Sequence, residues 1–243
     1  MMHKKLKITA IVLVAILILC CGAVGIYAAD YYRMDLHAAQ AMLNDEAVDV
    51  SQYTGSSNYA EFVPKHPKAG FIFYPGGKVE YTAYAPLMRA LAEQDILCVI
   101  PKMPLNLAVL DMDAADKILR LYPEIDTWYI GGHSLGGSMA ASYAAESDDF
   151  TGLILLASYS TADLTETDLD VLSIYGTEDG VLNMEKYEEY RSNLPDNTLE
   201  HIIDGGNHAQ FGSYGAQDGD GIAQVSSEEQ LKLTVEAIMN LLS

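Results

Sequence analysis

Three residues of the sequence have the types that acyl-transfer chemistry needs. They are Ser134, Asp179 and His208, and each lies in a glycine-rich stretch. A serine hydroxyl is a weak nucleophile at neutral pH, so it needs a histidine that takes its proton and an acid that orients the histidine. Together the three residue types predict attack by the Ser134 hydroxyl on a carbonyl carbon.

The serine lies in Gly132-His133-Ser134-Leu135-Gly136, which matches the pattern G-x-S-x-G. A short apolar run at residues 127–130 precedes this stretch, and small residues typical of a helix follow at 138–145. A strand, a sharp turn and a helix are the context in which this pattern exposes a nucleophilic serine. The alternative is a glycine-rich turn in which Ser134 only caps the helix, and the rest of the chain must decide between them.

The acid is expected after a strand on the same edge of the sheet. Asp179 follows the apolar run that ends at Tyr175, and it comes after the serine and before the histidine along the chain. That order, serine then acid then histidine, is the one in which this strand-turn-helix motif finds its partners. Asp179 could instead be an ordinary turn residue before Gly180, with Glu178 or Asp204 as the acid.

Elimination indicates which histidine is the base. His208 follows a strand-like run that ends at Ile203, again within glycines. The others precede the core, lie inside a predicted strand or occupy the variable position before the serine, which points away from the reactive side of Ser134; they are His3, His37, His66, His201 and His133. His208 is therefore the predicted general base.

Attack on a carbonyl creates a negatively charged oxygen, which needs hydrogen-bond donors fixed in place beforehand. The backbone N–H of Leu135, directly after the serine, is one expected donor. The other is expected from the loop after an early strand, Tyr74-Pro75-Gly76-Gly77-Lys78, whose glycines allow close approach to a substrate. This loop lacks the spacing of a phosphate-binding P-loop.

Strand-like and helical runs alternate along the chain, which predicts an α/β fold with a mostly parallel, doubly wound sheet flanked by helices. The predicted strands are residues 70–74, 96–100, 127–130, 153–157, 171–175 and 199–203. The predicted helices are residues 84–93, 111–121, 138–145, 184–192 and 228–242. We expect residues 30–60 to form a connector, helical around 36–43 and with antiparallel edge strands in 48–63, and residues 61–243 to form the catalytic domain.

Residues 1–29 have the pattern of a membrane anchor. Lys4, Lys5 and Lys7 precede an apolar run, Ile8 to Ile26, that is long enough to cross a bilayer. The run exceeds the usual signal-peptide core of about 7 to 15 residues, which favours an uncleaved single-pass helix with the catalytic domain outside the cell membrane. Cleavage near Ala23-Val24-Gly25, followed by secretion, is the alternative, and lipidation of Cys20 or Cys21 is not favoured.

Composition excludes several other functions. The formal net charge is −20, which repels phosphate backbones, so we do not expect nucleic acid as a partner. Beyond the anchor only Cys98 remains, in an apolar strand, and we expect it to be buried and without a catalytic role. No Cys/His cluster indicates a metal, and the chemistry predicted here needs neither a metal nor an organic cofactor.

Gly-His-Ser-Leu-Gly-Gly at 132–137, Gly-Thr-Glu-Asp-Gly at 176–180 and Gly-Gly-Asn-His-Ala-Gln-Phe-Gly at 205–212 together resemble motifs of the α/β-hydrolase superfamily. More narrowly, they resemble its small, lidless, dienelactone-hydrolase-like bacterial members, several of which are membrane-tethered. The likeness covers roughly residues 61–243. It implies Ser134 as nucleophile, His208 as base and Asp179 as orienting acid. The chain departs from the common His-Gly oxyanion loop at Pro75, which leaves either Gly77 or Lys78 as the second donor.

These expectations define a serine hydrolase that cleaves a carboxylic ester or a related acyl bond of a small molecule through an acyl-enzyme. Two alternatives remain: an acyltransferase that uses the same residues but excludes water, and a non-catalytic binding module on the same fold. The sequence indicates neither the acyl-chain length of the substrate nor an oligomeric state.

Overall fold

The computed structural model describes residues 13–16, 18–19, 22–25, 27–55 and 58–242. The chain divides into two compact units between Tyr31 and Tyr32. The described residues from 13 to 29 are helical, and no helix in the described part of the chain is both long and apolar enough to cross a membrane. The apolar run at 8–26 lies partly outside the described residues, as do Cys20 and Cys21.

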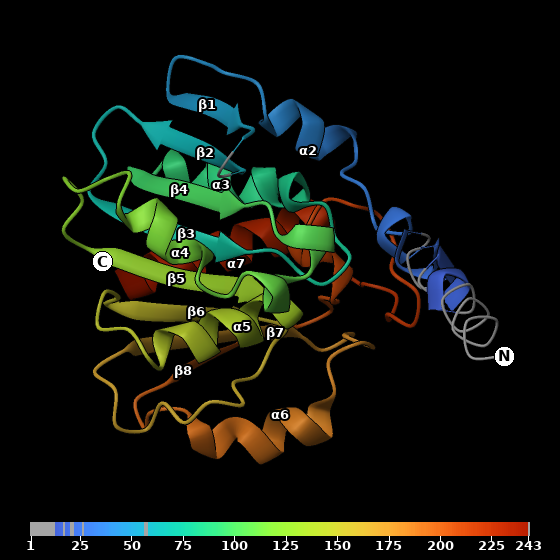
Figure 1. The fold of residues 1–243 in the computed structure, drawn as a ribbon. Coiled ribbons are helices and arrows are strands. Elements are labelled where there is room, and N and C mark those ends of the chain that lie inside the picture. The colour runs from blue at the N-terminus through green and yellow to red at the C-terminus, as the bar shows by residue number, and fades with distance from the viewer. Residues whose placement is uncertain (1–12, 17, 20–21, 26, 56–57, 243) are drawn as a thin grey trace, which may run out of the picture. The chain divides into compact units, whose positions relative to one another are not determined.

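The second unit is built on one sheet, in which eight strands can be traced among the described residues (Figure 1). Their order across the sheet is β1-β2-β4-β3-β5-β6-β7-β8. The strands are β1 (Val48–Tyr53), β2 (Tyr59–Pro64), β3 (Ala69–Tyr74), β4 (Ile96–Pro101), β5 (Trp128–His133), β6 (Gly152–Leu156), β7 (Asp170–Gly176) and β8 (Leu199–Ile203). β2 runs antiparallel to both β1 and β4, and all other neighbours are parallel.

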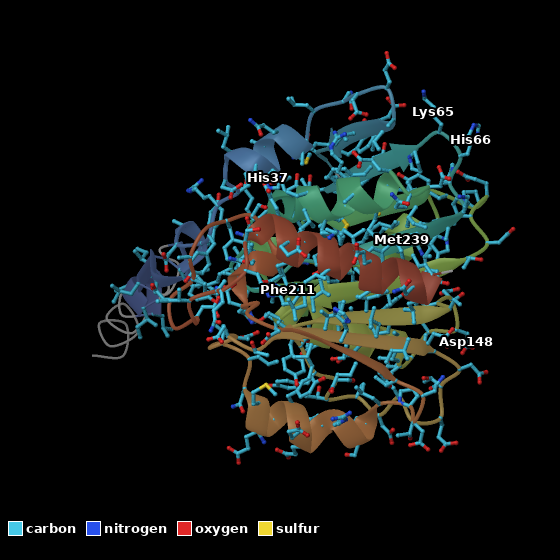
Figure 2. All side chains as sticks on the ribbon, turned by 180° about the vertical axis from the view of Figure 1, so that it is seen from behind. His37, Lys65, His66, Asp148, Phe211 and Met239 are labelled. Atoms are coloured by element: carbon cyan, nitrogen blue, oxygen red, sulfur yellow. The ribbon has the colours of Figure 1, made fainter. Side chains whose placement is uncertain are left out.

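Helices cover both faces of this sheet. They are α2 (Leu36–Ala41), α3 (Ala85–Ala92), α4 (Ala114–Leu119), α5 (Leu135–Ala144), α6 (Met184–Tyr190) and α7 (Ser227–Leu242). Figure 1 shows α4 and α5 in front of the sheet, and Figure 2, turned by 180°, shows α3 and α7 in front of the opposite face, with Met239 marking α7. Parallel strands that are buried on both faces have continuous apolar sequences, which is why these strands could be predicted from the sequence.

The central strand β3 shows how one sequence serves both faces. All six of its residues are buried. Phe71 and Phe73 pack in the core beneath α3 and α7, whereas Ile72 and Tyr74 pack in the core beneath α4 and α5. Successive side chains of a strand point to opposite faces, so this alternation places β3 in the middle of both cores. Its carboxyl end, from which the Pro75–Lys78 loop departs, is thereby held rigidly.

The predicted fold class is confirmed: the unit is a mostly parallel sheet flanked by helices. Two details differ from expectation. β2 is not an edge strand, because it pairs with β4 as well as with β1, so residues 48–64 belong to the main sheet. Helix α5 begins at Leu135 instead of Ser138, directly after the serine.

Candidate active site

The turn between β5 and α5 holds Ser134 in a backbone conformation that residues with a side chain rarely adopt. Its φ is 52° and its ψ is −122°. Such a conformation costs roughly 1–3 kcal/mol and persists only where the surroundings impose it. Here the Ser134 N–H donates to the Leu156 carbonyl at 2.9 Å, and the Ser158 hydroxyl donates to the Ser134 carbonyl at 2.7 Å. The end of β6 therefore fixes the strained turn from both sides.

The glycine after this turn is required by the close approach of β3. A Cβ atom on Gly136 would overlap the carbonyl oxygens of Tyr74 and Pro75. Those oxygens belong to backbone, which cannot move aside as a flexible side chain would. The first turn of α5 can therefore lie against the end of β3, beside the loop expected to hold the oxyanion, only because residue 136 has no side chain.

Asp179 and His208, from loops after β7 and β8, meet in the folded chain. The Nδ1 atom of His208 lies 2.9 Å from Oδ2 of Asp179, and both side chains are only 1% exposed. The other carboxylate oxygen, Oδ1, accepts the N–H groups of Val181 at 2.9 Å and Leu182 at 2.7 Å. These bonds fix the carboxylate, which in turn fixes the imidazole with its proton on Nδ1.

The second ring nitrogen of His208 remains available. Its Nε2 atom is buried and has no hydrogen-bond partner among the described residues. An imidazole that holds its proton on Nδ1 presents a lone pair at Nε2, which is the atom that accepts a proton in serine-dependent acyl transfer. Ser134 is not bonded to Nε2 in this structure. Catalytic hydrogen bonds are often long without substrate and tighten when it binds.

The two alternative acids lie elsewhere. Glu178 accepts a hydrogen bond from the Gln224 amide at 2.7 Å, and Asp204 lies 3.5 Å from the Thr177 hydroxyl, both on exposed surface. Neither has a bond to His208 among the described residues. The structure thus places Asp179, and neither of the alternatives, against the histidine.

Backbone donors for an oxyanion lie next to Ser134. The N–H of Leu135 is the first of α5, and the first N–H groups of a helix have no partner within it. In the loop after β3, the Gly76 N–H donates to the Tyr84 hydroxyl at 3.0 Å and the Lys78 N–H donates to the Asn106 carbonyl at 2.8 Å. No acceptor for the Gly77 N–H occurs among the described residues. Gly77, and not Lys78, therefore keeps an open donor here.

His133 lies closer to His208 than the sequence indicated. Its ring is buried, with its centroid 4.4 Å from that of His208 and 5.8 Å from that of Phe211. Its Nδ1 lies 2.8 Å from the Tyr84 hydroxyl. Burial, with a smaller contribution from His208, holds the pKa of His133 well below its usual value, so the ring is neutral at pH 7. Because the His133 ring is neutral, it packs against the His208 ring without repelling a positive charge on that ring.

Sequence reasoning missed Tyr84 and Ser158, which hold the loop after β3 and the serine turn. Ser158 stands two residues after β6, at the edge where the other candidate side chains gather, so the rule of strand ends could have found it. Tyr84 lies one position before α3, and nothing local distinguishes it from a packing tyrosine. Burial raises the pKa of Tyr84, so its hydroxyl keeps the proton that it shares with His133.

A cavity of about 360 Å³ opens at the carboxyl end of β4, on the same edge of the sheet. Its lining includes Met103, Pro104 and Leu105 together with Lys102. The chain continues from there to Asn106, which binds the loop after β3 through the Lys78 N–H. Apolar side chains therefore adjoin the loop that carries Gly77. No group of three metal-ligating side chains occurs in the described part of the chain.

A serine in a strained turn between a parallel strand and a helix, with an Asp–His pair on the same edge of the sheet, is an arrangement typical of α/β hydrolases. The chain belongs to the α/β-hydrolase family, whose sequence model matches residues 70–232. No curated protein matches it in sequence.

Solved structures share the fold at low sequence identity. A candidate dienelactone hydrolase from Klebsiella pneumoniae is 14% identical, with a TM-score of 0.59 over 81% of this chain and 99% of that one. Est1E from Butyrivibrio proteoclasticus is 13% identical, with a TM-score of 0.59 over 81% and 99% of the two chains. An α/β-hydrolase enzyme from the sediment metagenome of the Mar Chica lagoon is 16% identical, with a TM-score of 0.57 over 79% and 98%.

Proposed function

We propose that this protein is a serine hydrolase that cleaves a carboxylic ester or a related acyl bond through an acyl-enzyme intermediate. The observation that carries the proposal is the buried 2.9 Å contact between His208 Nδ1 and Asp179 Oδ2, which leaves Nε2 without a partner among the described residues, at the edge of the sheet that also holds the Ser134 turn. Membership of the α/β-hydrolase family supports the same reaction class.

The proposed reaction has two halves. The Ser134 hydroxyl attacks the carbonyl carbon while His208 Nε2 takes its proton, and Asp179 stabilises the imidazolium that forms. The N–H groups of Leu135 and Gly77 hold the negative oxygen of the tetrahedral intermediate. The imidazolium then returns the proton to the leaving alcohol, which departs and leaves the acyl group on Ser134. A water molecule, deprotonated by His208, releases the acid.

The decisive experiment compares the parent with Ser134→Ala on p-nitrophenyl esters of graded chain length. We expect the variant to lose essentially all of the rate enhancement that depends on the acyl-enzyme, a fall in kcat of at least about 10³-fold. Ser142→Ala is the matched control, because Ser142 lies on the same helix and its hydroxyl, as far as the described residues show, bonds only the Ser138 carbonyl within that helix. A fluorophosphonate probe should label the parent and Ser142→Ala but not Ser134→Ala.

Three outcomes would count against the proposal. Unchanged turnover in Ser134→Ala removes the serine from the chemistry. A folded parent that neither turns over esters nor takes the probe indicates a binding module on the same fold. Acyl transfer to an added alcohol that outpaces hydrolysis indicates an acyltransferase.

We also propose that residues 1–29 anchor the protein, with the hydrolase unit outside the cell membrane. The apolar run of residues 8–26 and the three lysines before it support this orientation. Among its described residues, Leu13, Ile18 and Leu19 are 61%, 65% and 73% exposed. Exposing apolar surface to water costs about 25 cal/mol per Å² of free energy, and a bilayer would remove this cost.

A further inference from the structure

Asp220, in the loop between β8 and α7, gathers an unusual set of backbone donors. Its Oδ1 accepts the N–H groups of Gly221 at 2.8 Å, Gly180 at 3.1 Å and His208 at 3.2 Å. Its Oδ2 accepts the N–H of Ala209 at 2.8 Å. Three N–H groups therefore share the lone pairs of Oδ1, and a fourth binds Oδ2, so backbone donors engage both oxygens of the carboxylate.

The donors come from the two loops that bring the acid and the histidine together. Gly180 directly follows Asp179, whereas His208 and Ala209 belong to the loop after β8. Bonds from N–H groups to a charged acceptor are roughly twice as strong as bonds between neutral groups. The two loops also bond each other directly through backbone, but the Asp220 carboxylate binds the N–H of His208 itself and that of Gly180, next to Asp179.

Close packing holds Asp220 in this place. A Cβ atom on Gly221 would overlap the Glu178 carbonyl oxygen, so the chain beside Asp220 lies directly against the backbone of the acid loop. On the other side, the Asn207 amide donates to the Gly221 carbonyl at 2.9 Å. The buried Gln230 side chain in turn bonds the Asn207 N–H at 3.0 Å and the Asn207 carbonyl at 2.8 Å. The segment around Asp220, a later part of the connection that holds His208, is thus fixed both to the Asp179 loop and to the residues beside His208.

We infer that Asp220 is a positioning residue, which sets the distance and angle between Asp179 and His208 by binding the backbone of both loops. The inference rests on the proposed roles of that pair. Neighbouring strands β7 and β8 fix where the two loops start, at Gly176 and Ile203, and the Glu178 N–H, which donates to the Gly206 carbonyl at 2.8 Å, joins the loops further along. Asp220 binds them where the pair itself lies, at His208 and at Gly180, directly after Asp179.

Asp220→Asn tests this inference with little change of size. An amide nitrogen cannot accept a hydrogen bond. The variant therefore loses either the bond from the Ala209 N–H, now on Oδ2, or the bonds from the Gly180 and His208 N–H groups, now on Oδ1. We expect kcat to fall about 10- to 100-fold, the effect of a displacement near 1 Å at a catalytic group, while KM stays close to that of the parent. The far-downfield proton NMR resonance of the Asp179–His208 bond, assigned by its loss in Asp179→Asn, should weaken or shift.

Asp218→Asn is the matched control, since it removes the same charge from an exposed position two residues away. We expect its kcat and its NMR resonance to equal those of the parent. An equal fall in kcat in both variants would show that the charge of this segment matters and the bonds from Asp220 to the two loops do not. That result would overturn the inference. An unchanged kcat and resonance in Asp220→Asn also overturn it.

The two proposals fail in distinguishable ways. A parent that shows the resonance but hydrolyses no ester overturns the proposed function, and the NMR comparison still decides the role of Asp220. If Asp220→Asn does not fold, Asp220→Glu replaces it. That variant keeps the charge on a longer side chain, so we expect a shifted resonance and a lower kcat. Parent values for both would overturn the inference.

Discussion

At the residue scale, the candidate site contains two histidines, His208 and His133, whose surroundings differ. His208 keeps one nitrogen bonded to Asp179 and the other open. His133, packed against it, is fully enclosed and its Nδ1 contacts the Tyr84 hydroxyl. Burial penalises the charged form of an imidazole, which keeps His133 neutral at pH 7. The difference is one of environment, because the two side chains are identical.

The depressed pKa of His133 predicts a dependence of stability on pH. In the unfolded chain its imidazole takes a proton near pH 6.5, whereas in the folded protein it does so only at much lower pH. The unfolded state then binds more protons, so the free energy of unfolding falls as pH decreases below about 6.5. Between about pH 7 and about pH 5, we expect His133 to account for a loss of about 2 kcal/mol, measured by urea unfolding.

His133→Asn isolates this contribution, because it keeps an acceptor for the Tyr84 hydroxyl but does not titrate. The variant should be less stable than the parent at pH 7 and should lose less stability on acidification. His66→Asn, at an exposed position, should follow the pH dependence of the parent. A His133→Asn variant that loses as much stability as the parent would contradict the assignment.

Local chemistry marks three of the candidate residues in the sequence. Ser134, Asp179 and His208 each stand in glycine-rich turns after apolar strands, and the structure brings the last two into contact. Sequence reasoning could not locate Asp220 or Tyr84, because the partners that matter lie 11 to 40 and 8 to 49 residues away along the chain. No short-range pattern encodes such contacts; they arise only when loops from different strands meet.

At the element scale, the junction of β3, β5 and α5 decides the geometry of the site. Glycine is a poor helix former, so the sequence predicted a helix that starts only at Ser138. The helix in fact starts at Leu135 and includes Gly136 and Gly137. Contact with the end of β3 outweighs local propensity here. The same explanation applies to β5, which continues through two glycines to His133.

Gly136→Ala sets these two effects against each other. In an isolated helix this change would stabilise by about 1 kcal/mol. In this junction the added methyl group meets the carbonyl oxygens of Tyr74 and Pro75, and overpacking of this kind costs about 1–3 kcal/mol. We expect a lower Tm and a lower kcat/KM, since the loop that carries Gly77 must move. Ser142→Ala on the same helix should change neither, and a raised Tm in Gly136→Ala would show that propensity wins.

At the scale of the whole molecule, the chain separates a hydrolase unit from an N-terminal segment of different character. Residues 32–243 contain the entire described sheet, the serine turn and the Asp179–His208 pair. Most strands were predictable, because parallel strands buried on both faces appear as unbroken apolar runs. The position of β2 between β1 and β4 was not predictable. A strand that pairs antiparallel on both sides has the same local sequence pattern as a strand of an edge hairpin.

This separation predicts that the hydrolase unit works without its N-terminal segment. A chain of residues 32–243 should remain in the supernatant after ultracentrifugation and should hydrolyse a water-soluble ester with the kcat/KM of the full chain, because no residue of the proposed site precedes Tyr32.

The full chain should sediment with membranes. Detergent but not high salt should release it, because burial of an apolar helix in a bilayer, unlike attachment through surface charges, does not depend on ionic strength. Protease added to intact cells should remove the activity if the unit lies outside. Full-length protein that stays in the supernatant, or activity protected from the protease, would contradict the anchor or its orientation, and a shortened active chain in the medium would identify a cleaved signal instead.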